Sequence, residues 1–411
     1  MTYHGFTAAA AALALVLASP RASAQASPHA REPAAAGSAI TPAARTFDIR
    51  ASSEVSLYAD TNAVTVVTPT AAATVEDKAG AWSANGHYLA DIVSAASVDI
   101  VSTASPRWTE VRHEAGVSAT YKPGATGARL SAAVSREPDY LSVSGGGLLL
   151  LEMANKNFNP AFGYAFTSDT AGRTGTPFSV FSRQLQLHSF AAAAEVVLNR
   201  RSVLLLEADA VLELGDSSKP YRYLPLFAPD VAPSIQPGAS LADVNQRRLP
   251  GRIGERVPGE RLRLSLTARF ARRFNGASVQ LFERLYGDDW GLFASTSEAR
   301  YLWDLSERLV FWLSARWHVQ TGVFFWDRAY TARFDAGAIV VPTYRSGDRE
   351  LGPLLSAGAG AGLRWALGPR ARRHDTHVSL QLDEMATSFR DTLYVDGRVA
   401  HLVVLQAETK F

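Results

Sequence analysis

Two adjacent carboxylates, Asp288 and Asp289, lie in a short polar break, Tyr286-Gly-Asp-Asp-Trp-Gly291. Paired acidic residues at a rim can bind Ca²⁺, or can activate water for hydrolysis together with a histidine. The same residue types also build tight turns, and a tryptophan beside such a turn is typical of an anchor at a membrane interface. We favour the turn, with Trp290 as the anchor, and predict neither a catalytic residue nor a metal site.

A second cluster with possible chemistry is His374, Asp375 and His377. Residues i and i+3 of an extended strand point to opposite faces, so these two histidines cannot share a metal ion unless a turn bends the chain. The chain has no cysteine, which excludes disulfides, thiolate metal sites and cysteine nucleophiles. No Ser–His–Asp order is evident either. We therefore predict a protein without cofactor or enzymatic activity.

Charged residues alternate with apolar residues along several segments, which places them on one face of a strand. The charged faces hold Glu110, Arg112, Glu114, Glu207, Asp209, Arg261, Arg263 and Arg269. Such side chains could line a charged pore and set its selectivity. They could equally form ion pairs that hold the wall of the protein together. The sequence leaves both roles open.

Two further patterns have a structural and a functional interpretation. Gly358, Gly360 and Gly362 recur at every second position of a strand, without the strand-to-helix transition of a phosphate-binding loop. They predict space for a large side chain or a loop inside the protein. Arg252, Arg256 and Arg261 flank a proline-rich segment and are candidates for binding lipopolysaccharide phosphates.

The N-terminal residues predict export. Ala8 to Ala18 is an apolar run that ends before Pro20, and Ala22-Ser-Ala24 is a small-x-small cleavage site. We expect a signal peptide over residues 1–24, a flexible periplasmic leader over 25–45, and one structural unit over 46–411. A formal net charge of +2 gives no electrostatic reason to expect a nucleic-acid partner.

The alternation predicts an all-β fold: a transmembrane antiparallel up-and-down barrel of about 16 strands, within a range of 14 to 18. The expected strands are 47–58, 62–75, 81–95, 108–121, 126–137, 139–152, 157–166, 180–197, 201–214, 260–272, 277–286, 292–303, 308–325, 352–366, 375–386 and 398–411. Phe411 ends the last strand and is typical of the signal read by the barrel assembly machinery. Fixing that end at the periplasmic rim requires residues 309–325 to be one strand. It places seven short breaks on the same rim, at 76–80, 122–125, 155–157, 199–201, 275–276, 304–307 and 368–375.

Several segments resemble a known family of predicted outer-membrane proteins, the domain of unknown function 3570. The matching pieces are Asp99-Ile-Val-Ser-Thr-Ala-Ser-Pro106 with Trp108, Ser135-Arg-Glu-Pro-Asp-Tyr140, Glu255-Arg-Val-Pro-Gly-Glu-Arg-Leu-Arg263, and Tyr286-Gly-Asp-Asp-Trp-Gly291 with Glu298 and Arg300. The resemblance extends over residues 50 to 411 and is loose between 145 and 255. It implies an outer-membrane barrel and no particular activity.

We expect a non-enzymatic channel in the outer membrane of a Gram-negative bacterium, or a scaffold for periplasmic proteins. A rim hydrolase and a receptor or adhesive barrel that uses its outer loops are the alternatives. The expected partners are outer-membrane lipid, the barrel assembly machinery and periplasmic proteins. Residues 215–259 would either fold inward and narrow the lumen or lie outside it as a cap.

Overall fold

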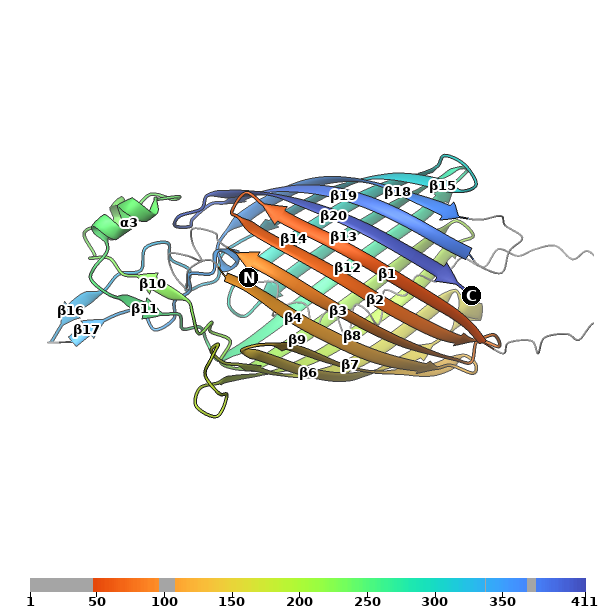
Figure 1. The fold of residues 1–411 in the computed structure, drawn as a ribbon, viewed down its shortest axis with the longest axis horizontal. Coiled ribbons are helices and arrows are strands. Elements are labelled where there is room, and N and C mark those ends of the chain that lie inside the picture. Colours follow the sequence, from red (N-terminus) through yellow and green to blue (C-terminus); the bar gives the residue numbers. More distant parts are fainter. Residues whose placement is uncertain (1–46, 96–107, 337, 368–374) are drawn as a thin grey trace, which may run out of the picture.

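The computed structural model describes residues 47–95, 108–336, 338–367 and 375–411, in which sixteen antiparallel strands close into one barrel (Figure 1). Each barrel strand pairs with the next in sequence, and the ring closes where β1 pairs with β20. The all-β, sixteen-strand prediction is confirmed. The proposed signal peptide, the leader, the Asp99–Pro106 motif and His374 lie outside the described residues.

The first nine strands follow one another without interruption. They are β1 (Phe47–Asp60), β2 (Val64–Asp77), β3 (Trp82–Ala95), β4 (Trp108–Tyr121), β5 (Thr126–Glu137), β6 (Tyr140–Leu151), β7 (Phe158–Ala171), β8 (Arg183–Asn199) and β9 (Ser202–Gly215). The remaining barrel strands are β12 (Glu260–Phe274), β13 (Ala277–Asp288), β14 (Phe293–Asp304), β15 (Leu309–Gln320), β18 (Leu354–Leu367), β19 (Asp375–Phe389) and β20 (Gly397–Lys410).

Two strand ends differ from the prediction by five residues. The strand expected to end at residue 166 continues to Ala171. The segment 309–325 was expected to be a single strand, but β15 ends at Gln320, where its pairing with β18 also ends at Leu354. The Gln320 side-chain amide donates to the carbonyls of Glu350 and Gly352, and the backbone then leaves the wall. Val323 and Phe325 are buried against Val257, Trp290 and Leu292 of other loops, so their apolar side chains do not lie in the barrel wall.

The two faces of the barrel wall have opposite character. Along β12, Leu262, Leu264 and Leu266 point outward, and Leu266 is 61% exposed. Their neighbours Arg261 and Ser265 are buried on the inner face. Large exposed apolar side chains recur on nearly every strand, which is the surface that lipid covers in a transmembrane barrel.

Every described connection at one end of the barrel is short, whereas the long connections lie at the other end together with short turns at 61–63, 138–139 and 289–292. Short turns after β2, β4, β6, β8, β12 and β14 lie at the end that carries Phe47 and Lys410, which we call the turn end. The backbone N–H of Phe411 donates to the carbonyl of Ile49 there. The three connections 216–259, 321–353 and 390–396 lie at the opposite, loop end. The predicted parity of strands is therefore confirmed.

These three connections fold together into one body, which we call the cap. It contains β10 (Tyr223–Pro225), η2 (Ala232–Ser234), α3 (Leu241–Arg247), β11 (Arg252–Gly254), β16 (Arg333–Asp335), β17 (Ala338–Val340) and η3 (Arg349–Leu351). Figure 1 shows α3 and the two small hairpins beyond the rim of the barrel. None of the helices among the described residues is long and apolar enough to cross a bilayer.

The cap has a small hydrophobic core of its own. Phe227, Ile235 and Val244 from the first connection are fully buried and pack with Ala329 from the second. The third connection joins through Asp391, whose carbonyl accepts from the Trp326 indole at 2.9 Å and whose carboxylate pairs with Arg328. Three segments distant in sequence therefore stabilise one another.

Candidate functional site beneath the cap

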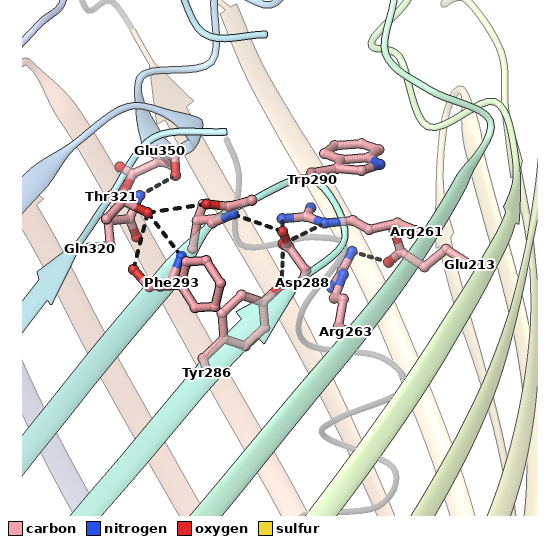
Figure 2. A network of polar contacts seen from close by, with 12 residues as sticks. Glu213, Arg261, Arg263, Tyr286, Asp288, Trp290, Phe293, Gln320, Thr321 and Glu350 are labelled. Carbon is pink, nitrogen blue, oxygen red and sulfur yellow. Dashed lines mark hydrogen bonds and ion pairs between the residues drawn. The ribbon is translucent and has the colours of Figure 1, made fainter. Parts of the chain in front are cut away.

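Three arginines of β12 find acidic partners on the neighbouring strands β9 and β13. Arg261 forms two hydrogen bonds with Asp288, with the shorter at 2.5 Å, and Arg263 pairs with Glu213 (Figure 2). Farther along the strand, Arg269 lies 3.6 Å from Glu207. These contacts join neighbouring strands, so they stabilise the barrel wall whether or not the interior also conducts solutes.

Three more of the singled-out residues lie on inner faces of the wall. Asp209 accepts a hydrogen bond from the Ser265 hydroxyl at 3.0 Å. On the other side of the barrel, Arg112 binds Asp91 at 2.5 Å and lies 3.8 Å from Glu114.

The inner face of β4 also contributes to an acidic cluster. Glu110 has carboxylate oxygens within 4.8 Å of those of Glu137 and Asp139. Asp139 accepts from the Tyr221 hydroxyl at 2.5 Å, which connects this cluster to the cap.

The Asp288–Gly291 break is a turn, as predicted. The Asp288 carboxylate accepts from the backbone N–H of Leu292 and from the Tyr286 hydroxyl, and Gly291 has a φ of +80°, which only glycine adopts readily. Asp288 is thus fully engaged as the partner of Arg261 and of its own turn. The structure gives Asp289 one contact, from its backbone N–H to the carbonyl of Leu262.

The assignment of Trp290 to a membrane interface was wrong. Its side chain is only 4% exposed and packs against Val257 and Phe325 of the cap. The indole N–H donates to the carbonyl of Glu260 at 2.8 Å, and the ring lies 4.2 Å from the guanidinium of Arg261 (Figure 2). The cap residues that cover this tryptophan keep it from contacting lipid, and the local sequence around Trp290 does not indicate these contacts.

Arg261 likewise does not bind lipopolysaccharide, because it is buried on the inner face of the wall. Arg256 exchanges backbone hydrogen bonds with Arg345 of the second connection. Arg252 belongs to the short hairpin β10–β11 of the cap.

The glycines at 358, 360 and 362 leave space on the inner face, as predicted. A Cβ at Gly362 would overlap the indole of Trp312, which is nearly buried. A Cβ at Gly360 would overlap the carboxylate of Asp383.

At the turn end, β19 begins at Asp375, which pairs with Lys410. Asp288 ends β13 at the loop end, so Asp375 and His377 lie at the opposite rim from the Asp288 turn. A hydrolytic site that combines them is excluded by this topology.

The root of the cap is held by three charged side chains that sequence analysis did not single out. Arg222 lies 3.1 Å from Glu255 and 2.9 Å from Asp348, so it joins the first connection to the second. Glu255 is also bound by the Ser346 hydroxyl at 2.5 Å and by the backbone N–H of Lys219. Burial alone would raise the pKa of Asp348, but the charge of Arg222, together with hydrogen bonds from Arg222 and from the Glu350 backbone N–H, holds that pKa below its usual value.

Tyr330 is the second joint of the cap root. Its hydroxyl donates to the carbonyl of Phe325 at 2.9 Å and accepts from the backbone N–H of Ser346 at 2.9 Å. Burial raises the pKa of Tyr330 to about 12. The only sequence signal for this network is the polarity of residues in two long loops. Polarity alone does not predict which of these residues form hydrogen bonds or ion pairs with each other.

The cap root and the inner wall enclose a cavity of about 450 Å³. Its walls come from the cap (Lys219, Arg222, Glu255, Asp348), from β12 and β13 (Arg261, Arg263, Arg284, Tyr286), from β15 (Arg316, His318) and from β7 (Asp169). A volume between 300 and 1,000 Å³ suits a small-molecule ligand. The predicted residues Arg261 and Arg263 therefore meet the cap residues that were missed.

The charges of the inner wall are unequally distributed around the ring. Arginines are in excess on β12 to β15, where Arg261, Arg263, Arg269, Arg273, Arg284, Arg300 and Arg316 face Asp288, Glu298 and Asp304. Carboxylates are in excess on β3 to β7, where Asp91, Glu110, Glu114, Glu137 and Asp169 face Arg112 and Arg129. In the ring of sixteen, β13 to β15 lie directly across from β3 to β5. The lumen is thus bordered by a basic wall and an acidic wall.

Residues 35–388 of the sequence match the family described as "Protein of unknown function (DUF3570)". The chain belongs to this family. The resemblance seen in the sequence is thereby confirmed, and DUF3570 as described carries no activity. No curated protein matches the chain in sequence.

Solved structures with a similar chain path are distant in sequence. One is OccK7 (OpdD) of Pseudomonas aeruginosa, with a TM-score of 0.42 and 11% identity over 89% of this chain and 98% of that one. Another is a mutant of the ferric enterobactin receptor PfeA from the same species, with a TM-score of 0.42 and 10% identity, where 88% of this chain spans 59% of the receptor. A bacterial polysaccharide outer membrane secretin gives a TM-score of 0.41 and 9% identity over 88% and 97%. No property of these proteins is transferred to this DUF3570 chain.

Proposed function

We propose that this DUF3570 protein is an outer-membrane channel for small polar solutes, whose outer mouth is covered by the cap. The observation that carries the proposal is the cavity of about 450 Å³ between the cap root and the charged inner wall. Barrels of sixteen strands are wide enough for an aqueous lumen. A solute that enters beneath the cap would pass between the basic wall and the acidic wall.

Opposed walls favour solutes that carry separated charges. A dipolar molecule can turn its anionic group toward Arg284 and Arg316 and its cationic group toward Glu110 and Glu137, so the field across the lumen orients it. An ion of either sign is attracted by one wall only.

The proposal is tested by reconstituting the folded protein in planar lipid bilayers. We expect discrete conductance steps. Arg316→Gln, which weakens the basic wall, should shift the reversal potential toward cation preference in a salt gradient. Arg308→Gln, an exposed arginine of the turn between β14 and β15, is the control and should leave the reversal potential unchanged. Folded protein that gives no conductance, in wild type and in cap-loosened variants, would contradict the channel.

The location and the assembly route are part of the proposal. The apolar outward face and the orientation of short turns support insertion into an outer membrane, with the cap outside the cell. We propose that Phe411 is the recognition signal for the barrel assembly machinery. Phe411→Ser should lower the amount of heat-modifiable barrel in membranes, whereas Phe47→Ser at the same rim should not.

A receptor function is the second candidate, and the tip of the cap favours it. Phe334 and Ile339 pair across the β16–β17 hairpin and are 76% and 68% exposed. Exposed apolar side chains on a protruding hairpin are typical of protein contact sites. Phe334→Ser with Ile339→Ser should abolish binding of an extracellular partner and leave conductance unchanged.

A further inference from the structure

The outward face of the barrel has a groove near the loop end, above β13, β14 and β15. Its volume is about 740 Å³, and its walls are formed by Leu285, Phe293, Val319 and Pro353, with Ser295 and Arg390 among the other lining residues. Leu285, Phe293 and Val319 are among the exposed large hydrophobic side chains, so the groove opens toward the side that lipid covers.

The groove exists because a small residue interrupts the apolar surface. Ser295 of β14 pairs with Leu285 on one side and with Val319 on the other, and it is much smaller than both. Its hydroxyl donates to a carboxylate oxygen of Glu283 at 2.7 Å, and Ser297 donates to the other oxygen at 2.5 Å. The polar groups of the floor are thus satisfied by one another, and the groove keeps apolar walls.

A cation stands at the rim of the groove. Arg390 follows the last residue of β19, is exposed, and is fixed through its backbone N–H, which donates to the carbonyl of Pro353 at 3.0 Å. Among the residues that the structure describes, no carboxylate forms an ion pair with its guanidinium. The groove therefore combines apolar walls on the outward face of the barrel with a positive charge at its rim, one residue beyond the end of β19.

We propose that this groove binds a membrane lipid with an anionic phosphate headgroup. One acyl chain would lie over Ser295 between Leu285, Phe293 and Val319, and the phosphate would bind Arg390 through charge-assisted hydrogen bonds. The charge at the rim complements an anionic headgroup and gives no reason to prefer a neutral one. The inference depends on the proposed membrane location and is independent of whether the lumen conducts.

Native mass spectrometry of the folded barrel in detergent tests the proposal. The probes are phosphatidylglycerol, phosphatidylethanolamine with the same acyl chains, and inorganic phosphate. We expect one retained phosphatidylglycerol, weaker retention of phosphatidylethanolamine, and no retained phosphate, because a phosphate without a chain gains nothing from the groove. Equal retention of the two lipids, or retention of phosphate alone, would overturn the proposal.

Two variants separate the headgroup from the chain. Arg390→Gln should reduce the affinity for phosphatidylglycerol about fivefold, the effect of one basic residue at a membrane surface. It should reduce the affinity for phosphatidylethanolamine less, because the ammonium group of that lipid offsets the charge of its phosphate. Ser295→Phe should fill the groove and reduce retention of both lipids. The matched controls are Arg308→Gln at the turn end and Ala361→Phe on the outward face of β18, and neither should change retention.

Heat-modifiable gel migration identifies the folded fraction of each variant. If Ser295→Phe does not fold, Arg390→Gln alone decides whether the proposal holds. The same spectra report the mass of the assembly. A dimer that Ser295→Phe dissociates without changing lipid retention would show that a second copy of the chain occupies the groove, and would refute the lipid site. Absence of conductance in the bilayer experiment, in contrast, would refute the channel but not the lipid site, and lipid retention should then still be observed.

Discussion

Arg222→Met should loosen the cap while leaving the barrel intact. Arg222 is the only cation within ion-pair distance of both Glu255 and Asp348 among the described residues, and it connects two of the three cap connections. Methionine keeps much of the length and the apolar stem of arginine. The substitution therefore removes a charge and leaves two carboxylates without their counterion.

The magnitude follows from the burial of those carboxylates. The Glu255 side chain is 2% exposed and that of Asp348 is 9% exposed, and breaking a buried ion pair by removing one partner costs about 3–5 kcal/mol. Arg222 itself is 17% exposed and Glu255 keeps its bond from Ser346, so we take the lower end. About 3 kcal/mol corresponds to roughly a hundredfold increase in the population of open caps.

Hydrogen exchange measures that population directly. The amides of Arg256 and Arg345, which bond to each other's carbonyls across the two connections, should exchange roughly a hundredfold faster in the variant. Amides of β12 should be unaffected. Arg247→Met, an exposed arginine on α3 in the same cap, is the matched control and should change exchange little.

A second substitution tests whether the uncompensated carboxylates cause the opening of the cap. Asp348→Asn in the Arg222→Met background removes one of the uncompensated charges and should recover part of the protection. If Arg222→Met changed cap exchange by less than threefold, the reasoning that this arginine holds the connections together would be refuted. If exchange rose but the open probability in bilayers did not, the cap would be mobile without gating the lumen.

Four further predictions concern the same loop end and the inner wall. Because the pKa of Asp348 is depressed in the folded cap, its contribution is complete above its unfolded pKa, near 4, and is lost as the pH falls through the lower folded value, so cap exchange should rise only below about pH 4. The pKa of Tyr330 is raised to about 12, so its contribution is complete below pH 10 and is lost as the pH rises toward 12, an effect that Tyr330→Phe should abolish in exchange measurements. Trp290→Ala should cost about 3–5 kcal/mol of local stability, seen as proteolysis of the cap with the barrel intact. Gly362→Val should lower the yield of heat-modifiable barrel, because its side chain would overlap Trp312, and Ala361→Val on the opposite face should not.

The barrel could be predicted from the sequence because its determinants are local. Alternation along a strand, such as that from Arg261 to Phe270, fixes which side chains face lipid, and turn residues mark where strands end. One global fact, the position of Phe411, then sets the direction of every strand. The boundary error at residues 321–325 arose because Val323 and Phe325 continue the apolar pattern although they are buried in the cap.

The candidate site could be predicted only in part, for a physical reason. Arg261 and Arg263 were identifiable because they alternate with leucines on a strand. Asp288, the partner of Arg261, lies 27 residues away in sequence, and Glu213, the partner of Arg263, lies 50 residues away. Strand register, which the sequence does not give, determines that they meet. Arg222 and Asp348 lie in loops without periodicity, so no local pattern indicates that they meet.

The construction of the cap determines how it would open. Its connections share one hydrophobic core around Phe227 and Val244, and they are tied by Arg222 at the root and by Asp391 at the third connection. Moving one connection alone would expose part of that core and also break an ion pair, so separate motions are costly compared with movement of the whole cap. Movement of the whole cap breaks mainly the contacts between the cap and the wall, such as those of Trp290 with Val257 and Phe325. We therefore expect conductance to switch between two levels rather than to vary continuously, and Trp290→Ala to lengthen the open state without creating intermediate levels.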